Sequence, residues 1–124
     1  IAVVIDDNPI IRKSNKLILE KMSFDVRETP DPRVVLEAMD VKGPDFFSLI
    51  VIDLVIPAMS GAEFISVVKE RYPNSEVKIV VCSCVTDVNV IRHIASLGLD
   101  GYVIKPVDYS AFIYKIREIF CPEL

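Results

Sequence analysis

Polar side chains occur where four apolar runs of the sequence end. Two carboxylates, Asp6 and Asp7, follow the first run, and Asp53 follows the second. The third run ends at the hydroxyl of Ser83, and the fourth ends at the ammonium group of Lys105. The runs cover residues 1–5, 48–52, 78–82 and 101–104. These five residues are therefore candidates for a shared site.

Their functional groups suit a site that binds a hard cation and accepts a phosphoryl group. Three neighbouring carboxylates would repel one another unless a cation lay among them, and Mg²⁺ is the usual cation where carboxylates meet a phosphate. An ammonium and a hydroxyl can both contact phosphoryl oxygens, and a carboxylate beside them is a reasonable acceptor. Each residue alone has an ordinary structural explanation as a helix-preceding acid, a strand end or a turn residue. Their joint placement favours the site.

The elements that carry these residues are predicted to be parallel strands. Continuous runs rich in Val and Ile are typical of strands buried on both faces of a sheet. Strand and helix patterns alternate about five times along the chain, which predicts a doubly wound α/β fold. The carboxyl ends of all strands in such a sheet lie together, and ligands bind there. Residues distant in sequence should therefore converge at that end.

The helices between the strands are predicted from caps and apolar spacing. Asn8 is a candidate N-cap of the first helix, with Pro9 in its first turn. The apolar stripe of that helix is expected to comprise Ile10, Ile11, Ser14, Leu17, Ile18 and Met22. A fourth helix is predicted from about Asp87 to Leu97. Val90 and Leu97 are expected to widen its apolar arc beyond a core stripe of Val88, Ile91, Ile94 and Ala95. A short polar strand at 24–28 is expected at the side of the sheet.

Length, composition and charge exclude several classes of protein. The 124 residues suffice for one domain with a real core, and the apolar content of 52% with a mean hydropathy of +0.42 indicates a globular chain. No apolar run approaches a membrane span, and the net charge of −4 argues against direct nucleic acid binding. Three cysteines without framework spacing favour free thiols in a reducing compartment, the cytoplasm. Because the chain begins with Ile, we expect it to be trimmed or cut from a longer protein.

The motifs together resemble the receiver domain of bacterial two-component response regulators. They are Asp6-Asp7, then Asp53-Leu54-Val55-Ile56-Pro57-Ala58-Met59-Ser60-Gly61, then Ser83-Cys84, and finally Gly101-Tyr102-Val103-Ile104-Lys105-Pro106. The resemblance covers essentially the whole chain and implies one receiver domain over residues 1–124. It also implies a flavodoxin-like (βα)5 fold, a three-layer sandwich whose parallel sheet has the strand order 2-1-3-4-5.

The resemblance assigns the phosphoryl chemistry to the residues at the strand ends. Asp53 is then the phosphoacceptor, taking its phosphoryl group from the phosphohistidine of a sensor kinase or from a phosphotransfer protein. Mg²⁺ is bound directly by Asp7, Asp53 and the main-chain carbonyl of Val55, while Asp6 acts largely through water. Lys105 pairs with the phosphoryl group. The only catalysis implied is the domain's own phosphorylation and dephosphorylation.

The resemblance also implies how a signal leaves the site. Ser83 moves to hydrogen-bond the phosphoryl group, and Tyr102 changes rotamer in response. The surface formed by the fourth helix, fifth strand and fifth helix then changes, and it contacts an effector domain, a partner protein or a second copy of the chain in a homodimer. The Lys105-Pro106 peptide is expected to be cis, against the base rate for such bonds.

Three other functions compete with a phosphorylation-operated switch. A receiver-like interaction module that no longer takes phosphate would have the same fold, but the complete set of site residues argues against it. An aspartyl-nucleophile hydrolase would need a second Asp two positions after the nucleophile, where this chain has Val55. Nucleotide or flavin binding lacks a glycine-rich phosphate loop.

Overall fold

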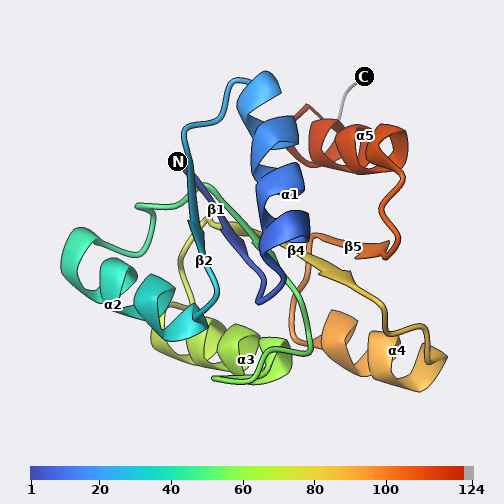
Figure 1. The fold of residues 1–124 in the computed structure, drawn as a ribbon. Helices are drawn as coiled ribbons and strands as arrows, with labels where there is room; N and C mark the ends of the chain where they lie inside the picture. Colours follow the sequence, from blue (N-terminus) through green and yellow to red (C-terminus); the bar gives the residue numbers. More distant parts are fainter. Residues whose placement is uncertain (122–124) are drawn as a thin grey trace.

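The computed structural model describes residues 1–121, and its five strands form one parallel sheet in the order β2-β1-β3-β4-β5 (Figure 1). The strands are β1 (Ala2–Ile5), β2 (Val26–Thr29), β3 (Leu49–Ile52), β4 (Lys78–Ser83) and β5 (Gly101–Ile104). The helices are α1 (Pro9–Lys21), α2 (Pro32–Lys42), α3 (Gly61–Arg71), α4 (Val88–Ser96) and α5 (Tyr109–Phe120). The predicted α/β class, strand order and side position of the polar strand β2 are confirmed.

Helices cover both faces of the sheet and give it three layers (Figure 1). On one face, Leu19 of α1 and Phe112 of α5 pack with one set of strand side chains. On the other face, Met39 of α2, Phe64 of α3 and Ile94 of α4 pack with the alternate set. Every residue of β1 and β3 is buried, which is why both read as continuous apolar runs.

Each helix begins after a residue whose side-chain oxygen accepts hydrogen bonds from the first turn. These N-caps are Asn8, Asp31, Ser60, Asp87 and Asp108. Such a cap typically stabilises a helix by about 1 kcal/mol. Four of these caps come within four residues of the preceding strand, so their loops at the carboxyl end of the sheet are short, while the loop from β3 to Ser60 is longer.

The predicted stripe of α1 is partly wrong. Ile10 and Leu17 are 76% and 58% exposed, whereas Asn15 and Leu19 are fully buried. Asn15 lies toward the sheet, where its Nδ2 is 4.0 Å from the sulfur of Cys82 on β4. The helix therefore turns Asn15 and Leu19 toward the sheet and leaves Ile10 and Leu17 exposed.

The predicted stripe of α4 is also partly wrong. Val88 is 64% exposed and Ala95 is exposed, while Ile94 is buried. Leu97, expected outside the core stripe, packs against the core at the end of the helix. Val90 is exposed as predicted. Ile94 is the one residue of this short helix that is buried.

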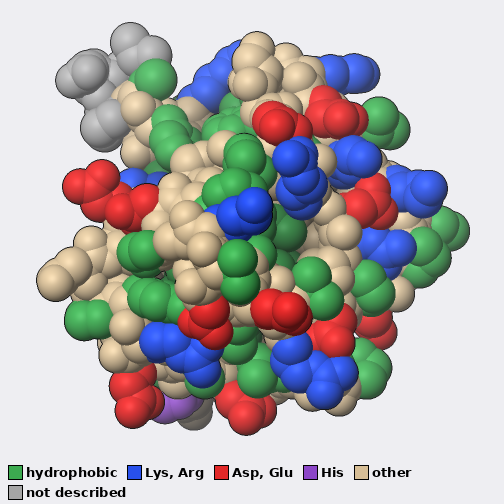
Figure 2. All heavy atoms as spheres, turned by 90° about the vertical axis from the view of Figure 1, so that its left-hand side faces the viewer, with side chains coloured by type: hydrophobic (Ala, Val, Ile, Leu, Met, Phe, Trp, Pro, Cys, Tyr) green, Lys and Arg blue, Asp and Glu red, His purple; other side chains and the backbone are tan. Residues whose placement is uncertain are grey.

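The face that carries α2 shows acidic and basic side chains mixed with hydrophobic ones (Figure 2). Among residues 1–121, no helix is both long and apolar enough to cross a membrane.

Candidate functional site

Three carboxylates meet at the carboxyl end of the sheet. β1 and β3 are neighbours in register, with Ile5 opposite Ile52, so the residues that follow them, Asp6 and Asp53, lie side by side. Asp6 and Asp53 are buried, and Asp7 is exposed. Oxygen atoms of the three carboxylates lie within 4.8 Å of one another. The predicted convergence of these residues is confirmed.

Lys105 lies between two of these carboxylates. Its Nζ donates to Asp6 Oδ2 at 2.8 Å and to Asp53 Oδ2 at 2.7 Å. Burial alone would lower the pKa of Lys105, but the hydrogen bonds to Asp53 and Asp6 outweigh burial and hold the pKa above its usual value. The Lys105 amide also donates to the Ser83 carbonyl at 2.9 Å. The Lys105-Pro106 peptide is cis, as predicted.

Ser83 and Tyr102 both bond to the backbone of Val85. Ser83 is fully buried at the end of β4, and its Oγ accepts from the Val85 amide at 3.4 Å. The Tyr102 hydroxyl donates to the Val85 carbonyl at 2.7 Å, and burial raises the pKa of this phenol. The two residues predicted to respond to phosphorylation thus share one anchor, in the loop that leads to α4.

The loop after β3 presents Asp53 to the site. The Val55 amide donates to Asp53 Oδ1 at 3.2 Å, and the Gly61 amide donates to the Leu54 carbonyl at 3.0 Å. A Cβ at residue 61 would lie 2.5 Å from the Asp53 carbonyl oxygen. Only glycine fits there without a shift of the backbone that carries Asp53.

Arg12 is a neighbour of the site that the sequence reasoning missed. Its Nη1 donates to the Asp6 carbonyl at 2.9 Å, and its Nε donates to Glu28 Oε1 at 3.0 Å. The bond from Arg12 lowers the pKa of Glu28 more than burial raises it, and Lys16 lowers it further. The feature of the sequence that could have indicated this role is a basic residue one turn into the helix that follows Asp6-Asp7.

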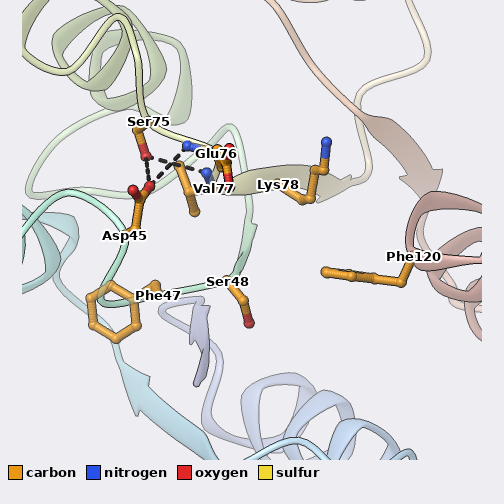
Figure 3. A pocket seen from close by; sticks show the side chains of 8 residues that line it. All are labelled: Asp45, Phe47, Ser48, Ser75, Glu76, Val77, Lys78 and Phe120. Carbon is orange, nitrogen blue, oxygen red and sulfur yellow. Dashed lines mark hydrogen bonds between the residues drawn. The ribbon is translucent and has the colours of Figure 1, made fainter.

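A cavity of about 610 Å³ lies at the opposite, amino end of the sheet (Figure 3). Its polar groups bond to one another: Asp45 Oδ1 accepts from Ser75 Oγ at 3.0 Å and from the Glu76 amide at 2.8 Å. Phe120 of α5 faces this cluster from across the cavity. The residues that line this cavity do not include Asp6, Asp7 or Asp53.

A family model described as the response regulator receiver domain matches residues 2–117. The chain belongs to this family. This receiver domain also resembles curated regulators over nearly its full length. It is 29% identical to the transcriptional regulatory protein DegU of Brevibacillus brevis over 94% of this chain and 48% of that protein. It is 30% identical to the DNA-binding response regulator MtrA of Mycolicibacterium smegmatis over 93% of this chain and 48% of that protein.

A solved structure shows the same architecture. The CheY-like receiver domain protein from Methanospirillum hungatei JF-1 superposes with a TM-score of 0.81 and 25% identity, over 94% of this chain and 90% of that one. The receiver domain spans about half the length of the two curated regulators named above. Its membership in two-component signalling is therefore established at the level of the domain.

Proposed function

We propose that this receiver domain is a phosphorylation-operated switch whose phosphoacceptor is Asp53. The observation that carries the proposal is the position of Lys105, whose ammonium is held between Asp6 and Asp53. Asp53 follows the central strand β3, and its Oδ1 is already oriented by the Val55 amide. A carboxylate held this way is directed toward an incoming phosphorus atom.

The donor set fits a hard divalent cation. The carboxylate oxygens of Asp6, Asp7 and Asp53 lie close enough to share one ion, and oxygen ligands are those that Mg²⁺ prefers. We assign direct contacts to Asp7, Asp53 and the Val55 carbonyl, and a contact through water to Asp6. When bound, Mg²⁺ would neutralise charge on the transferred phosphoryl oxygens.

The residues of the chain perform the transfer in one displacement. A carboxylate oxygen of Asp53 attacks the phosphorus of a phosphohistidine, the new P–O bond forms, and the P–N bond to the departing imidazole breaks. Lys105 stays protonated and offers its ammonium to the phosphoryl oxygens. Loss of the group by attack of water reverses the state, so the domain's catalysis acts only on itself.

We further propose that the phosphorylated state is transmitted through Ser83 and Tyr102. The Ser83 hydroxyl would leave the Val85 amide for a phosphoryl oxygen, and Tyr102 would reorient beside it. The α4-β5-α5 face would then change its affinity for an effector domain, a partner protein or a second copy of the chain. A sensor histidine kinase or a phosphotransfer protein would supply the phosphoryl group in the cytoplasm.

The proposal is tested with radiolabelled acetyl phosphate and Mg²⁺. Asp53→Asn should abolish labelling, whereas the matched variant Asp45→Asn, at the amino end of the sheet, should label like the wild type. Asp7→Ala should also block labelling, and circular dichroism should show an intact fold because Asp7 is exposed. Undiminished labelling of Asp53→Asn would refute the assignment. Failure of the wild type to bind beryllofluoride would favour a phosphorylation-independent interaction module.

A further inference from the structure

We propose that Arg12 is a positioning residue for the cation site, acting through the peptide that joins Asp6 to Asp7. The inference rests on the proposed function, because it concerns the same acidic cluster. Arg12 touches none of the cluster's carboxylates through the bonds described. It binds the Asp6 carbonyl, and so fixes the backbone from which the Asp7 side chain extends.

The Arg12 side chain is held on two sides. Nη1 donates to the Asp6 carbonyl at 2.9 Å, and Nε donates to Glu28 Oε1 at 3.0 Å. Glu28 lies on β2 and also pairs with Lys16, whose Nζ is 3.4 Å from Oε2. The Arg12 side chain is only 15% exposed. A planar guanidinium can serve both acceptors in one fixed geometry, which an ammonium cannot do.

Every polar group of Asp6 takes part in a hydrogen bond. Its amide donates to the Thr29 carbonyl at 3.2 Å, and its carboxylate accepts from Lys105 at 2.8 Å and from the Asn8 amide at 2.9 Å. The remaining polar group, the Asp6 carbonyl, accepts the hydrogen bond from Arg12. Asp7 itself is exposed, so the fixed peptide before it keeps its carboxylate near Asp53.

The sign of the effect distinguishes positioning from simple electrostatics. Arg12 is a positive charge close to the acidic cluster, and removing a positive charge should strengthen the binding of a cation through Coulomb attraction. Loss of geometry should instead weaken binding, because groups that orient metal ligands typically contribute about 10- to 100-fold in affinity. Weaker binding in a charge-removing variant therefore identifies positioning.

The test measures Mn²⁺ binding to the whole 124-residue chain by electron paramagnetic resonance, without a phosphodonor. Mn²⁺ stands in for Mg²⁺ because it also prefers oxygen ligands in octahedral geometry. Arg12→Met should raise the dissociation constant for Mn²⁺ about tenfold. Arg12→Lys keeps the charge but loses the planar guanidinium, and should raise the dissociation constant less. The matched control is Arg71→Met, which removes an exposed arginine paired with Asp40 and should leave binding unchanged.

A second readout follows the Mg²⁺ concentration needed for half-maximal labelling by acetyl phosphate. In the Arg12 variants it should rise, while labelling at saturating Mg²⁺ should recover. Unchanged or tighter Mn²⁺ binding in Arg12→Met would overturn the proposed role of Arg12 but not the cation site. If Arg12→Met does not fold, wild-type affinity in Arg12→Lys would overturn it. A wild-type chain that binds no Mn²⁺ would overturn the cation site itself, and with it this inference.

Discussion

Lys105 and Lys78 lie at opposite ends of the same sheet, and their surroundings differ sharply. Lys105 is 2.8 Å from Asp6 and 2.7 Å from Asp53, with the three side chains 7%, 3% and 10% exposed. Lys78 is 4.0 Å from Asp100, and these side chains are 42% and 28% exposed. Burying charge is costly, so the arrangement around Lys105 indicates a role beyond stability.

The polar groups of the two ends also differ in how far they satisfy one another. At the amino end, the cavity between Asp45 and Phe120 is roomy, but Asp45 already accepts from Ser75 and Glu76. At the carboxyl end, Asp6 and Asp53 share the ammonium of Lys105, and the carboxylate of Asp7 lies close to both. The surplus of negative charge, rather than the volume of a cavity, is what makes the carboxyl end suited to a cation.

The comparison predicts its largest effect for the two lysines. Lys105→Met should lower the free energy of unfolding by about 3 kcal/mol, because it leaves buried carboxylates without their partner. Lys78→Met should cost less than about 1 kcal/mol, since its pair is exposed. Urea denaturation in EDTA measures both. Equal losses for the two variants would break the comparison.

A smaller effect is expected at the glycine that packs on the Asp53 backbone. Gly61→Ala should cost about 2 kcal/mol through overpacking and should also reduce phosphoryl labelling, because the new Cβ displaces the Asp53 carbonyl. Gly43→Ala is the control: its φ of +113° makes alanine strained, yet its Cβ would meet nothing within 4 Å. The control should lose about 1 kcal/mol and label normally; impaired labelling there would argue against a local effect at Gly61.

At the amino end, substitution should affect stability without affecting chemistry. Asp45→Ala removes the acceptor of two hydrogen bonds and should cost about 1 kcal/mol. Labelling by acetyl phosphate should remain at the wild-type rate. A large fall in labelling rate would show that the two ends of the sheet are coupled.

The smallest effect is predicted for the ion pair of Glu28 with Arg12, and it depends on pH. The folded-state pKa of Glu28 lies below its usual value of 4.5, so the pair stabilises the fold above that pH and loses its contribution as the pH falls through the folded-state pKa. Glu28→Gln should therefore cost less than about 1 kcal/mol at neutral pH and nothing in strong acid. Denaturation curves of both proteins across the acid range measure this, and a difference that grows in acid would contradict it.

The sequence predicted the fold and the convergence of polar side chains at the carboxyl end of the sheet, because both depend on strand ends. Asp6, Asp53, Ser83 and Lys105 each follow an apolar run, so parallel pairing alone brings them together. Arg12 was missed because an arginine that bonds to a main-chain carbonyl leaves no periodic signal in sequence.

The helix phases were harder to predict because they depend on contacts between distant elements. Apolar residues such as Leu17 suggested one face of α1, but the structure buries Asn15 and Leu19 instead. In α4, Leu97 reaches the core from the end of the helix, which its spacing did not reveal. Tertiary contact overrides local pattern in both helices.

The central position of β1 bears on how the chain folds during synthesis. β1 precedes the other described strands in sequence, but in the sheet it lies between β2 and β3. Both pairings are parallel, so neither can form as a simple hairpin. At about 5–20 residues per second, a ribosome needs roughly 2–9 s to go from Ile5 to Ile52 and complete the second neighbouring strand. Until then Ala2–Ile5 lacks at least one of its two neighbouring strands, so its apolar side chains stay accessible to chaperones for that time.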